Sequence, residues 1–389
     1  MLTDQAVIFC GGLGNRISKI TKKIPKPLIR VNGKPVIEHI IKNFARFGIK
    51  ETLLLCGYKS FLFKKKYHNK KLFGIKIKCI NESKPLGTSG ALLNSQKYLK
   101  RYFILSNGDT FFDINLSDLI MNFHKEKKAI SYIALKRIKK NLRYDAFNLN
   151  KKNQINLVKN FKFMSINSGI SVVRKDIIKY LNKSGSLEKI VFPKLIKKKR
   201  LYGKIYNNDF IDMGTYKDLK RTSSLLKKIY FKPALFLDRD GVLNKDIGYL
   251  YKSKDFIWKP KIIEFIKKYN NLNYYIFIIT NQSGIGRGFY SESDLEILHS
   301  WIQNKIRQKG GNIDEFFFAP YFKDSKNRKY RKNKNLRKPG IGMIRLASRN
   351  WNINFKKSFL IGDSKSDMTT AKNANIKYKI IPFNKPLKF

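Results

Sequence analysis

Acidic, amide and hydroxyl side chains follow short apolar runs in the second half of the chain, and two basic side chains precede a Pro-Gly. The first set is Asp238, Asp240, Thr280, Asn281, Gln282, Asp363 and Asp367, and the basic pair is Arg337 and Lys338. In an open α/β sheet the ligand binds beyond the carboxyl ends of the strands, so we expect these side chains to meet. Carboxylates from separate strands repel one another unless a cation joins them, and Mg²⁺ prefers carboxylate oxygens, water and substrate phosphate. The pattern predicts a magnesium-dependent phosphoryl-transfer site.

Four motifs stand in order in this half: DRDGVLN, TNQSG, the lysine of RKPG, and GDSKSD. Over about 150 residues this half resembles the haloacid dehalogenase (HAD) superfamily of phosphohydrolases. The resemblance implies that Asp238 is the nucleophile that forms an aspartyl-phosphate, and that Asp240 is the general acid and later the base. It also implies that Lys338 and Thr280 hold the phosphoryl oxygens. The magnesium ligands that it implies are Asp238, Asp240 and Asp363.

The loops around these motifs narrow the substrate class. DRDGVLNKDIGYL, TNQSGIGRGFYSE and RKPGIGM are similar to the capless histidinol-phosphate and heptose-bisphosphate phosphatases. The Gly248-Tyr249 pair favours a heptose bisphosphate. The substrate contacts implied are Asp246, Gly248, Tyr249, Asn281, Gln282 and Arg287, with Arg337 beside the catalytic lysine.

These phosphatase families often hold a structural zinc on a Cys-Pro-His and a Cys-x-Cys pattern. Here the chain reads Ala319-Pro-Tyr-Phe322 and Lys334-Asn-Leu336 at those places. Because the thiolates and imidazoles that zinc requires are replaced, we predict no zinc and a loop ordered in another way.

A glycine-rich turn, Gly11-Gly-Leu-Gly-Asn-Arg16, follows the apolar run AVIFC near the start of the chain. Glycines allow backbone N–H groups to approach a polyphosphate, and Arg16 and Lys26 supply positive charge. Asp109 and Asp212 each follow a further apolar run. These features favour a nucleoside triphosphate site.

Over about 220 residues the first half is similar to the sugar-phosphate nucleotidylyltransferases. The motifs PLGTSGAL, NGDTFFD, SLEK and FIDMGT make it most like the heptose 1-phosphate guanylyltransferases. The resemblance implies that a sugar 1-phosphate attacks the α-phosphorus of GTP, or another nucleoside triphosphate, and releases pyrophosphate. It assigns Mg²⁺ to Asp109 and Asp212 and the phosphates to Arg16 and Lys26. The remaining contacts implied are Gly11, Gly12 and Gly87 at the nucleotide, and Asn167, Gly169 and Glu188 at the sugar.

Three departures from this family stand out. Asn15 replaces the usual Thr, RYDAF at 143–147 replaces a usual RYG, and no Glu-Lys pair precedes Ile166. The lysine that meets the sugar phosphate is therefore expected at Lys159 or Lys162.

Both sets of residues need strands to position them. Short apolar runs alternate with segments of helical spacing in both halves, which predicts an α/β fold with two domains. Residues 1–225 are predicted to form a nucleotide-diphospho-sugar transferase domain with a Rossmann-like mixed sheet. Residues 226–233 form a linker, and residues 234–389 form a capless HAD-like Rossmannoid domain.

The composition bounds the possible partners. The formal charge is +55, from 82 basic and 27 acidic residues, but the lysines are scattered and follow no nucleic-acid-binding motif. We interpret this as a general composition bias and expect no specific nucleic-acid partner. Three isolated cysteines, with no apparent signal peptide and no apolar stretch of membrane-spanning length, predict a cytoplasmic protein without membrane insertion. The oligomeric state is not predicted.

The two predicted activities are chemically consecutive. Removal of the 7-phosphate from a heptose 1,7-bisphosphate yields the heptose 1-phosphate that a nucleotidylyltransferase uses, so the sequence predicts a bifunctional enzyme of NDP-heptose synthesis for a surface polysaccharide or lipopolysaccharide. One alternative is a phosphatase for histidinol phosphate or another sugar fused to a hexose 1-phosphate nucleotidylyltransferase. The other is a non-catalytic polyanion-binding protein on an enzyme scaffold.

Overall fold

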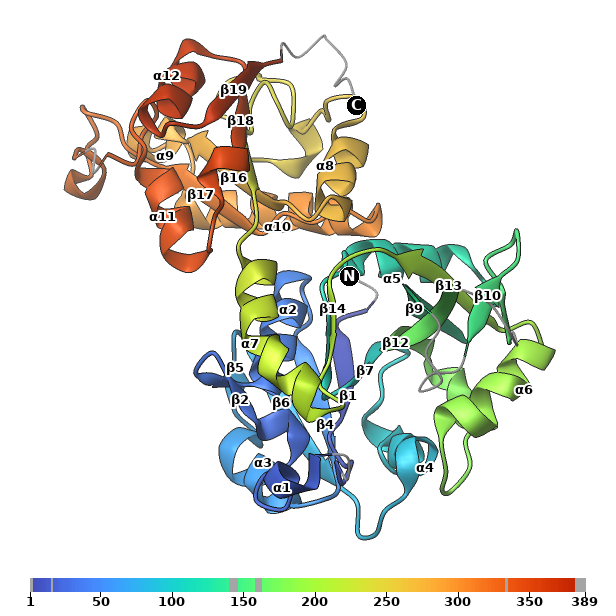
Figure 1. Cartoon of the computed structure of the whole chain (residues 1–389). Helices are drawn as coiled ribbons and strands as arrows, with labels where there is room; N and C mark the ends of the chain where they lie inside the picture. The colour runs from blue at the N-terminus through green and yellow to red at the C-terminus, as the bar shows by residue number, and fades with distance from the viewer. Residues whose placement is uncertain (1–2, 15–16, 140–145, 158–162, 333–334, 382–389) are drawn as a thin grey trace. The chain divides into compact units, whose positions relative to one another are not determined.

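The computed structural model describes residues 3–14, 17–139, 146–157, 163–332 and 335–381. It divides the chain into two units, residues 1–227 and 228–389. Helix α7 spans Tyr216–Tyr230, so the boundary falls within this helix and residues 226–230 of the predicted linker are helical (Figure 1).

A mixed sheet forms the centre of the first unit. Its strands are ordered β11-β10-β12-β7-β1-β4-β6-β5, with β9 pairing with β12 and β13 pairing with β9. Strand β1 (Gln5–Phe9) lies between two parallel neighbours, β4 and β7, and β12 runs antiparallel to β7. The other strands are β4 (Glu51–Cys56), β5 (Lys71–Leu72), β6 (Ile75–Asn81), β7 (Tyr102–Asn107), β9 (Ser131–Lys139), β10 (Phe147–Leu149), β11 (Ile155–Leu157), β12 (Phe163–Arg174) and β13 (Leu201–Tyr206).

Helix α2 (Val36–Arg46) of this unit buries one apolar face. Its buried apolar residues are at positions 36, 37, 40, 41 and 44, which is the spacing of one helical face. Two small ribbons complete the unit, β8 (Thr110–Phe112) with β14 (Phe210–Asp212), and β2 (Arg30–Val31) with β3 (Lys34–Pro35). The other helices are α1 (Ser18–Thr21), α3 (Ser60–Tyr67), α4 (Gly87–Asn94), α5 (Leu116–Lys125) and α6 (Phe192–Lys197).

A five-stranded parallel sheet, ordered β17-β16-β15-β18-β19, forms the centre of the second unit. Its strands are β15 (Ala234–Leu237), β16 (Tyr275–Asn281), β17 (Glu315–Ala319), β18 (Phe359–Gly362) and β19 (Lys377–Ile380). Its helices are α8 (Ile262–Asn271), α9 (Ser283–Arg287), α10 (Glu292–Gln308), α11 (Gly342–Asn350) and α12 (Lys365–Asn373).

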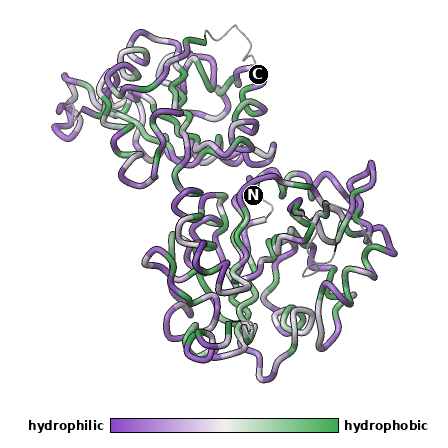
Figure 2. The backbone as a smooth tube through the Cα atoms, in the orientation of Figure 1, coloured by the Kyte–Doolittle hydropathy of each residue, from purple (hydrophilic) through white to green (hydrophobic). Residues whose placement is uncertain are grey.

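Successive residues of β15 point to opposite faces of this sheet, as the period of a strand requires. Leu235 and Leu237 pack in one cluster with apolar residues of α8 and α10. Ala234 and Phe236 pack in another with apolar residues of α11 and α12. Helices thus cover both faces, and the central strands of both units are hydrophobic (Figure 2). The predicted α/β class and the mixed first sheet are confirmed.

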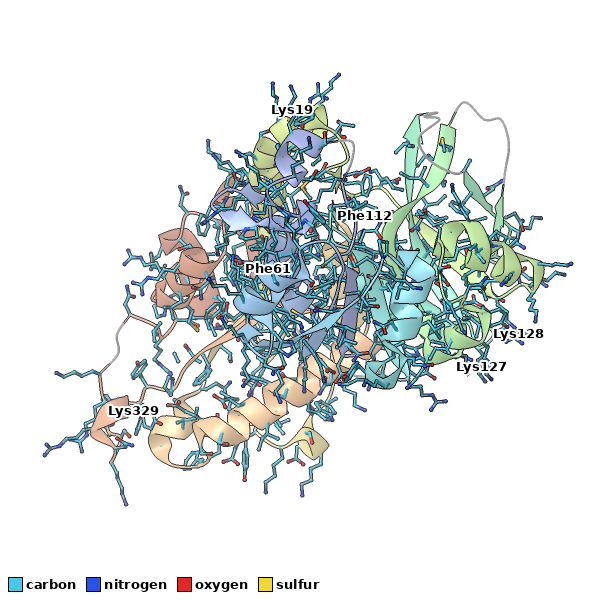
Figure 3. All side chains as sticks on the ribbon, turned by 90° about the horizontal axis from the view of Figure 1, so that it is seen from below. Lys19, Phe61, Phe112, Lys127, Lys128 and Lys329 are labelled. Carbon is cyan, nitrogen blue, oxygen red and sulfur yellow. The ribbon has the colours of Figure 1, made fainter. Side chains whose placement is uncertain are left out.

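Basic side chains are spread over separate elements. Lys19 on α1, Lys127 and Lys128 after α5, and Lys329 are all exposed and project outward (Figure 3). No helix in the described ranges combines the length and the apolar character needed to span a membrane.

Candidate active sites

The carboxyl ends of β15, β16 and β18 carry the predicted phosphatase residues. Because β15 lies between its two parallel neighbours, Asp238 stands between Thr280, at the end of β16, and Asp363, just beyond β18. A cavity of about 410 Å³ opens there. The predicted residues that line it are Asp238, Asp240, Asp246, Gly248, Tyr249, Thr280, Asn281, Gln282, Lys338 and Asp363.

Three carboxylates gather at this cavity. Asp238, Asp363 and Asp367 each place one oxygen within 4.8 Å of the others. Burial raises the pKa of Asp238 to about 7, helped by Asp367 and opposed by Lys338. Burial also raises the pKa of Asp363. A divalent cation bound by these carboxylate oxygens would offset the repulsion between the acids. The three residues therefore fit a divalent cation site.

Gly241 makes room for Asp363. Its φ is 81°, in the left-handed region that favours glycine, and a Cβ atom here would overlap Oδ2 of Asp363. The glycine of the DRDG motif is therefore required by the close approach of the acid.

Lys338 connects two of the acids. Its Nζ lies 2.7 Å from Asp238 Oδ2 and 2.6 Å from Asp367 Oδ1. Burial alone would lower the pKa of Lys338, but the two carboxylates outweigh it and raise that pKa. Asn281 binds the backbone of Lys338, because its Oδ1 accepts from Lys338 N and its Nδ2 donates to Lys338 O. Asn281 thus holds the segment that carries Lys338.

The Asp240 carboxylate is not one of the three gathered acids. Its Oδ1 accepts from Arg239 Nε (3.1 Å) and Asn244 Nδ2 (2.9 Å), and its Oδ2 accepts from Arg239 Nη2 (2.9 Å) and Gln282 Nε2 (3.0 Å). Arg239 is completely buried. These contacts orient Asp240 at the cavity wall, and a metal role for it stays a prediction.

Two predicted arginines lie outside the described cavity lining. The Arg287 guanidinium stacks 3.8 Å from the centroid of the Phe322 ring, and Arg337 Nη1 lies 3.4 Å from Tyr321 O. At the rim, Asp246 Oδ1 accepts from Gly248 N, and the Tyr249 ring meets Phe289 edge to face. The structure therefore places the loop residues at the cavity and the arginines beside it.

The loop that carries zinc in related phosphatases is tied down here by polar contacts. Lys329 Nζ and the Tyr330 hydroxyl both lie 2.8 Å from Glu292 Oε1 at the start of α10. Arg331 Nε donates to Ser325 O. Residues 319–336 contain neither Cys nor His, so this donor set does not fit zinc.

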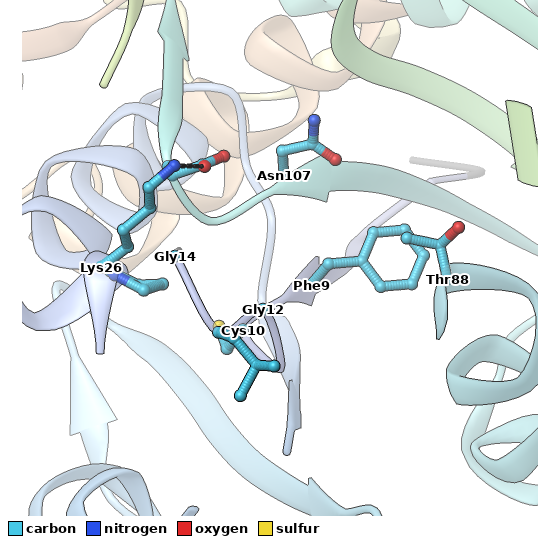
Figure 4. A pocket seen from close by; sticks show the side chains of 10 residues that line it. Phe9, Cys10, Gly12, Gly14, Lys26, Thr88 and Asn107 are labelled. Atoms are coloured by element: carbon cyan, nitrogen blue, oxygen red, sulfur yellow. Dashed lines mark hydrogen bonds and ion pairs between the residues drawn. The ribbon is translucent and has the colours of Figure 1, made fainter. Parts of the chain in front are cut away.

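A second site lies in the first unit, where a cleft of about 470 Å³ opens beyond β1. Phe9, Gly12, Lys26, Asn107 and Asp109 are among its lining residues (Figure 4). Lys26 Nζ is 2.9 Å from Asp109 Oδ2, and Lys26 is only 7% exposed. The structure thus brings together the predicted phosphate-binding lysine and one predicted metal ligand.

Asp212 reaches this region through the small β8–β14 ribbon. Asp212 pairs with Thr110 in register, and Met213 N donates to Asp109 O. The two predicted metal acids therefore lie on adjacent backbone segments, although Asp212 is not among the described residues that line the cleft.

The glycines of this unit have different roles. Gly12 faces the cleft and has open space where a Cβ would stand. Gly11 lies against Glu82, and Gly87 opens α4 with φ 66° against the Gly185 carbonyl. Gly12 thus lines the cleft, whereas Gly11 and Gly87 are closely packed against other parts of the chain, and their contacts with a nucleotide stay predictions.

A smaller cavity of about 130 Å³ holds the predicted sugar contacts Asn167, Gly169 and Glu188. It shares Phe9, Thr88 and Asn107 with the larger cleft. Asn167 Nδ2 donates to Glu188 Oε1 at 2.7 Å, and Asn167 Oδ1 accepts from Gly169 N at 3.0 Å. This polar pair lines the smaller cavity, next to the larger cleft.

Some predictions fall outside the described residues: Asn15, Arg16, the Arg143–Asp145 part of RYDAF, Lys159 and Lys162. The sequence places Asp367 with the other acids expected at this end of the sheet but assigns it no specific role. The sequence also gave no sign of Tyr290, which lines the cavity and donates a hydrogen bond to Gln282 in the folded unit.

Two family models match the chain. Residues 5–229 match a family described as nucleotidyl transferase, and residues 237–382 match one described as polynucleotide kinase 3 phosphatase.

Curated relatives match each activity separately. The chain is 42% identical over 145 residues to D-glycero-beta-D-manno-heptose-1,7-bisphosphate 7-phosphatase of Rhodopseudomonas palustris, covering 37% of this chain and 81% of the relative. It is 38% identical over 221 residues to D-glycero-alpha-D-manno-heptose 1-phosphate guanylyltransferase of Campylobacter jejuni, covering 55% of this chain and 96% of the relative.

Among solved structures, HddC from Yersinia pseudotuberculosis is similar, with a TM-score of 0.51 and 26% identity over 58% of this chain and 100% of that one. The same protein complexed with GMP-PN has a TM-score of 0.50 and 25% identity, with the same coverage. The chain therefore belongs to the nucleotidyl transferase family through residues 5–229, and its second part belongs to the family of the heptose-bisphosphate 7-phosphatases.

Proposed function

We propose that the chain is a bifunctional enzyme of NDP-heptose synthesis. The second unit removes the 7-phosphate from D-glycero-D-manno-heptose 1,7-bisphosphate, and the first unit transfers a guanylyl group from GTP to the resulting heptose 1-phosphate. The observation that carries the proposal is the presence on one chain of the Lys338–Asp238 cavity and the Lys26–Asp109 cleft. Relatives named for these two reactions support the substrates.

In the phosphatase reaction, an oxygen of Asp238 attacks phosphorus and the bond from phosphorus to the sugar oxygen breaks. The sugar oxygen takes a proton from Asp240, and the phosphoryl group remains on Asp238 as an aspartyl-phosphate. Water then gives a proton to Asp240 and attacks phosphorus, releasing phosphate and the free carboxylate. Lys338 and Thr280 hold the phosphoryl oxygens during both steps.

We propose that the cation of this site is Mg²⁺, held by Asp238 and Asp363. When bound, Mg²⁺ supplies positive charge that lets a carboxylate approach an anionic phosphoryl group. Lys338 contributes a fixed charge beside the nucleophile.

In the transferase reaction, a phosphate oxygen of the sugar 1-phosphate attacks the α-phosphorus, and the bond to the β-phosphate breaks to release pyrophosphate. The protein contributes position and charge rather than covalent chemistry. We propose that Lys26 neutralises the phosphates, that Asp109 and Asp212 hold Mg²⁺, and that the Asn167–Glu188 pair binds sugar hydroxyls. Because nucleoside triphosphates are cytoplasmic metabolites, we propose a cytoplasmic enzyme.

Phosphate release by the purified chain with Mg²⁺ tests the proposal. The substrates to compare are both anomers of the heptose bisphosphate, histidinol phosphate, and an oligonucleotide with a 3′-phosphate. The proposal predicts preference for a heptose bisphosphate, no release by Asp238→Asn, and pyrophosphate when GTP rather than ATP is added with heptose 1-phosphate. Preference for histidinol phosphate or the oligonucleotide would refute the heptose assignment.

A further inference from the structure

Gln282 is an almost fully buried residue in the wall of the phosphatase cavity. Its residue is only 2% exposed, and its Nε2 donates to two site residues, to Asp240 Oδ2 at 3.0 Å and to Thr280 Oγ1 at 2.8 Å. One buried amide therefore bridges the proposed acid–base residue and a proposed holder of the phosphoryl group.

Tyr290 fixes which way this amide points. Its hydroxyl donates to Gln282 Oε1 at 2.6 Å, which leaves Nε2 directed at Asp240 and Thr280. Burial raises the pKa of Tyr290 to about 12, so the hydroxyl keeps its proton near neutral pH. The Tyr290 ring stacks on Tyr251 and has room only because residue 284 is glycine, since a Cβ there would overlap the ring.

The Gln282 amide also determines in which direction the Thr280 hydroxyl can donate its hydrogen bond. Since Thr280 Oγ1 accepts a hydrogen bond from Gln282, its own hydrogen is available to donate elsewhere. Thr280 and Asp240 both line the cavity. A phosphoryl oxygen in that cavity is an acceptor, so the orientation suits Thr280 for binding it.

Arg239 completes the support of Asp240. Its guanidinium donates to both oxygens of that carboxylate and to Leu250 O. The Asp240 carboxylate is thus held by the buried Arg239 guanidinium, by Asn244 Nδ2 at Oδ1 and by the Gln282 amide at Oδ2. Gln282 is the one of these three that also contacts Thr280 and Tyr290 in the hydrogen bonds described above.

We propose that Gln282, oriented by Tyr290, is a positioning residue that aims the Asp240 carboxylate and the Thr280 hydroxyl at the phosphoryl group. This differs from the substrate contact predicted from the sequence. The inference rests on the proposed phosphatase activity.

The variant Gln282→Glu tests it in the full-length chain. Glutamate has nearly the same shape, but its oxygens cannot donate to Asp240 or Thr280. Tyr290→Phe is the milder second variant, because it removes only the hydroxyl that orients the amide. Gln303→Glu is the matched control, since Gln303 lies on α10 and its side chain hydrogen-bonds the backbone of Ile313. The thermal midpoint of each variant checks folding.

Two substrates separate positioning from a structural role. When a sugar bisphosphate reacts, its leaving group is an alkoxide that needs a proton from Asp240, whereas p-nitrophenyl phosphate releases a phenolate that does not. For Gln282→Glu we expect kcat on the sugar bisphosphate to fall about 100-fold with an unchanged KM. On p-nitrophenyl phosphate we expect a burst of one equivalent of p-nitrophenol before slow turnover, because the aspartyl-phosphate waits for the base. For Tyr290→Phe we expect kcat on the sugar bisphosphate and the turnover of p-nitrophenyl phosphate after the burst both to decrease by about tenfold.

A raised KM with unchanged kcat would make Gln282 a substrate contact and overturn the inference. Equal losses on both substrates without a burst, matching those of Gln303→Glu, would make it merely structural and overturn it too. If the wild-type chain released phosphate from neither substrate, the proposed function itself would fail, and the positioning role with it.

Discussion

Nζ of Lys338 lies 2.7 Å from Oδ2 of Asp238, and both side chains are almost completely buried. The lysine comes from the segment before α11 and the acid from the end of β15, so the contact exists only in the folded second unit. A buried ammonium beside the proposed nucleophile reduces the repulsion that an incoming phosphate meets.

Asp238→Asn removes the nucleophile while keeping its shape. We expect phosphate release from a heptose bisphosphate to fall on the order of 10³-fold or more, because an amide cannot form the aspartyl-phosphate. Guanylyl transfer to heptose 1-phosphate supplied directly is expected to stay within about twofold of wild type. Parallel loss of both activities in this variant would count against two separate sites.

The pH dependence of stability follows from the raised pKa of Asp238, about 7 against 3.8 for an ordinary aspartate. The folded state holds this proton more tightly than the unfolded chain. The contribution of Asp238 to the free energy of unfolding therefore decreases as pH rises from about 4 to about 7.

Without Mg²⁺ we expect the thermal midpoint of the second unit to decrease as the pH is raised from 5 to 8. Added Mg²⁺ favours the ionised form, so it should raise the midpoint more at pH 8 than at pH 5. Scanning calorimetry with and without Mg²⁺ measures this, and Asp238→Asn should flatten the dependence. An equal Mg²⁺ effect at both pH values would show that the carboxylate group does not bind the ion.

Lys26→Ala removes the buried charge that faces Asp109. We expect guanylyl transfer to fall about 100-fold, because the phosphates lose a fixed positive neighbour, while phosphate release is unchanged. Pyrophosphate formation measures the loss. The control is Lys127→Ala, an exposed lysine that should have no effect. If both variants lost transfer equally, the general positive charge rather than Lys26 would be responsible.

Gly241→Ala introduces a methyl group where Asp363 Oδ2 lies. We expect the acid to be displaced and phosphate release to fall at least about tenfold, with weaker Mg²⁺ stabilisation. Gly248→Ala is the comparison, because Gly248 has a similar positive φ but open space at the Cβ position. A loss no greater for Gly241 than for Gly248 would mean that backbone strain alone, rather than displacement of Asp363, explains the effect.

The sequence predicted that Asp238, Thr280 and Asp363 meet at the phosphatase cavity because each comes at or just after the end of a strand, and parallel strands end at one edge of the sheet. Lys338 follows no strand directly, and the RKPG motif rather than its spacing predicted its place. The sequence could not show how those residues divide the work. Gln282 and Asn281 are adjacent in TNQSG, yet the first orients Asp240 and the second holds the Lys338 backbone. Those roles depend on side-chain directions that spacing does not encode.

Long-range contacts set a similar limit in the first unit. The pairing of Asp212 with Thr110 joins segments about 100 residues apart, and no local sequence pattern predicts this pairing. Glycine in a turn has two explanations, ligand approach and close packing. At Gly87 the Gly185 carbonyl supplies the second, and a nucleotide contact at Gly87 stays a prediction.

One coupled reaction tests the central claim most directly. The purified chain is given D-glycero-D-manno-heptose 1,7-bisphosphate, GTP and Mg²⁺, and phosphate, pyrophosphate and nucleotide sugar are measured together. The bifunctional account predicts GDP-heptose with phosphate and pyrophosphate released in equal amounts, and no GDP-heptose from Asp238→Asn until heptose 1-phosphate is added. Phosphate release without any nucleotide sugar, even with heptose 1-phosphate supplied, would contradict it.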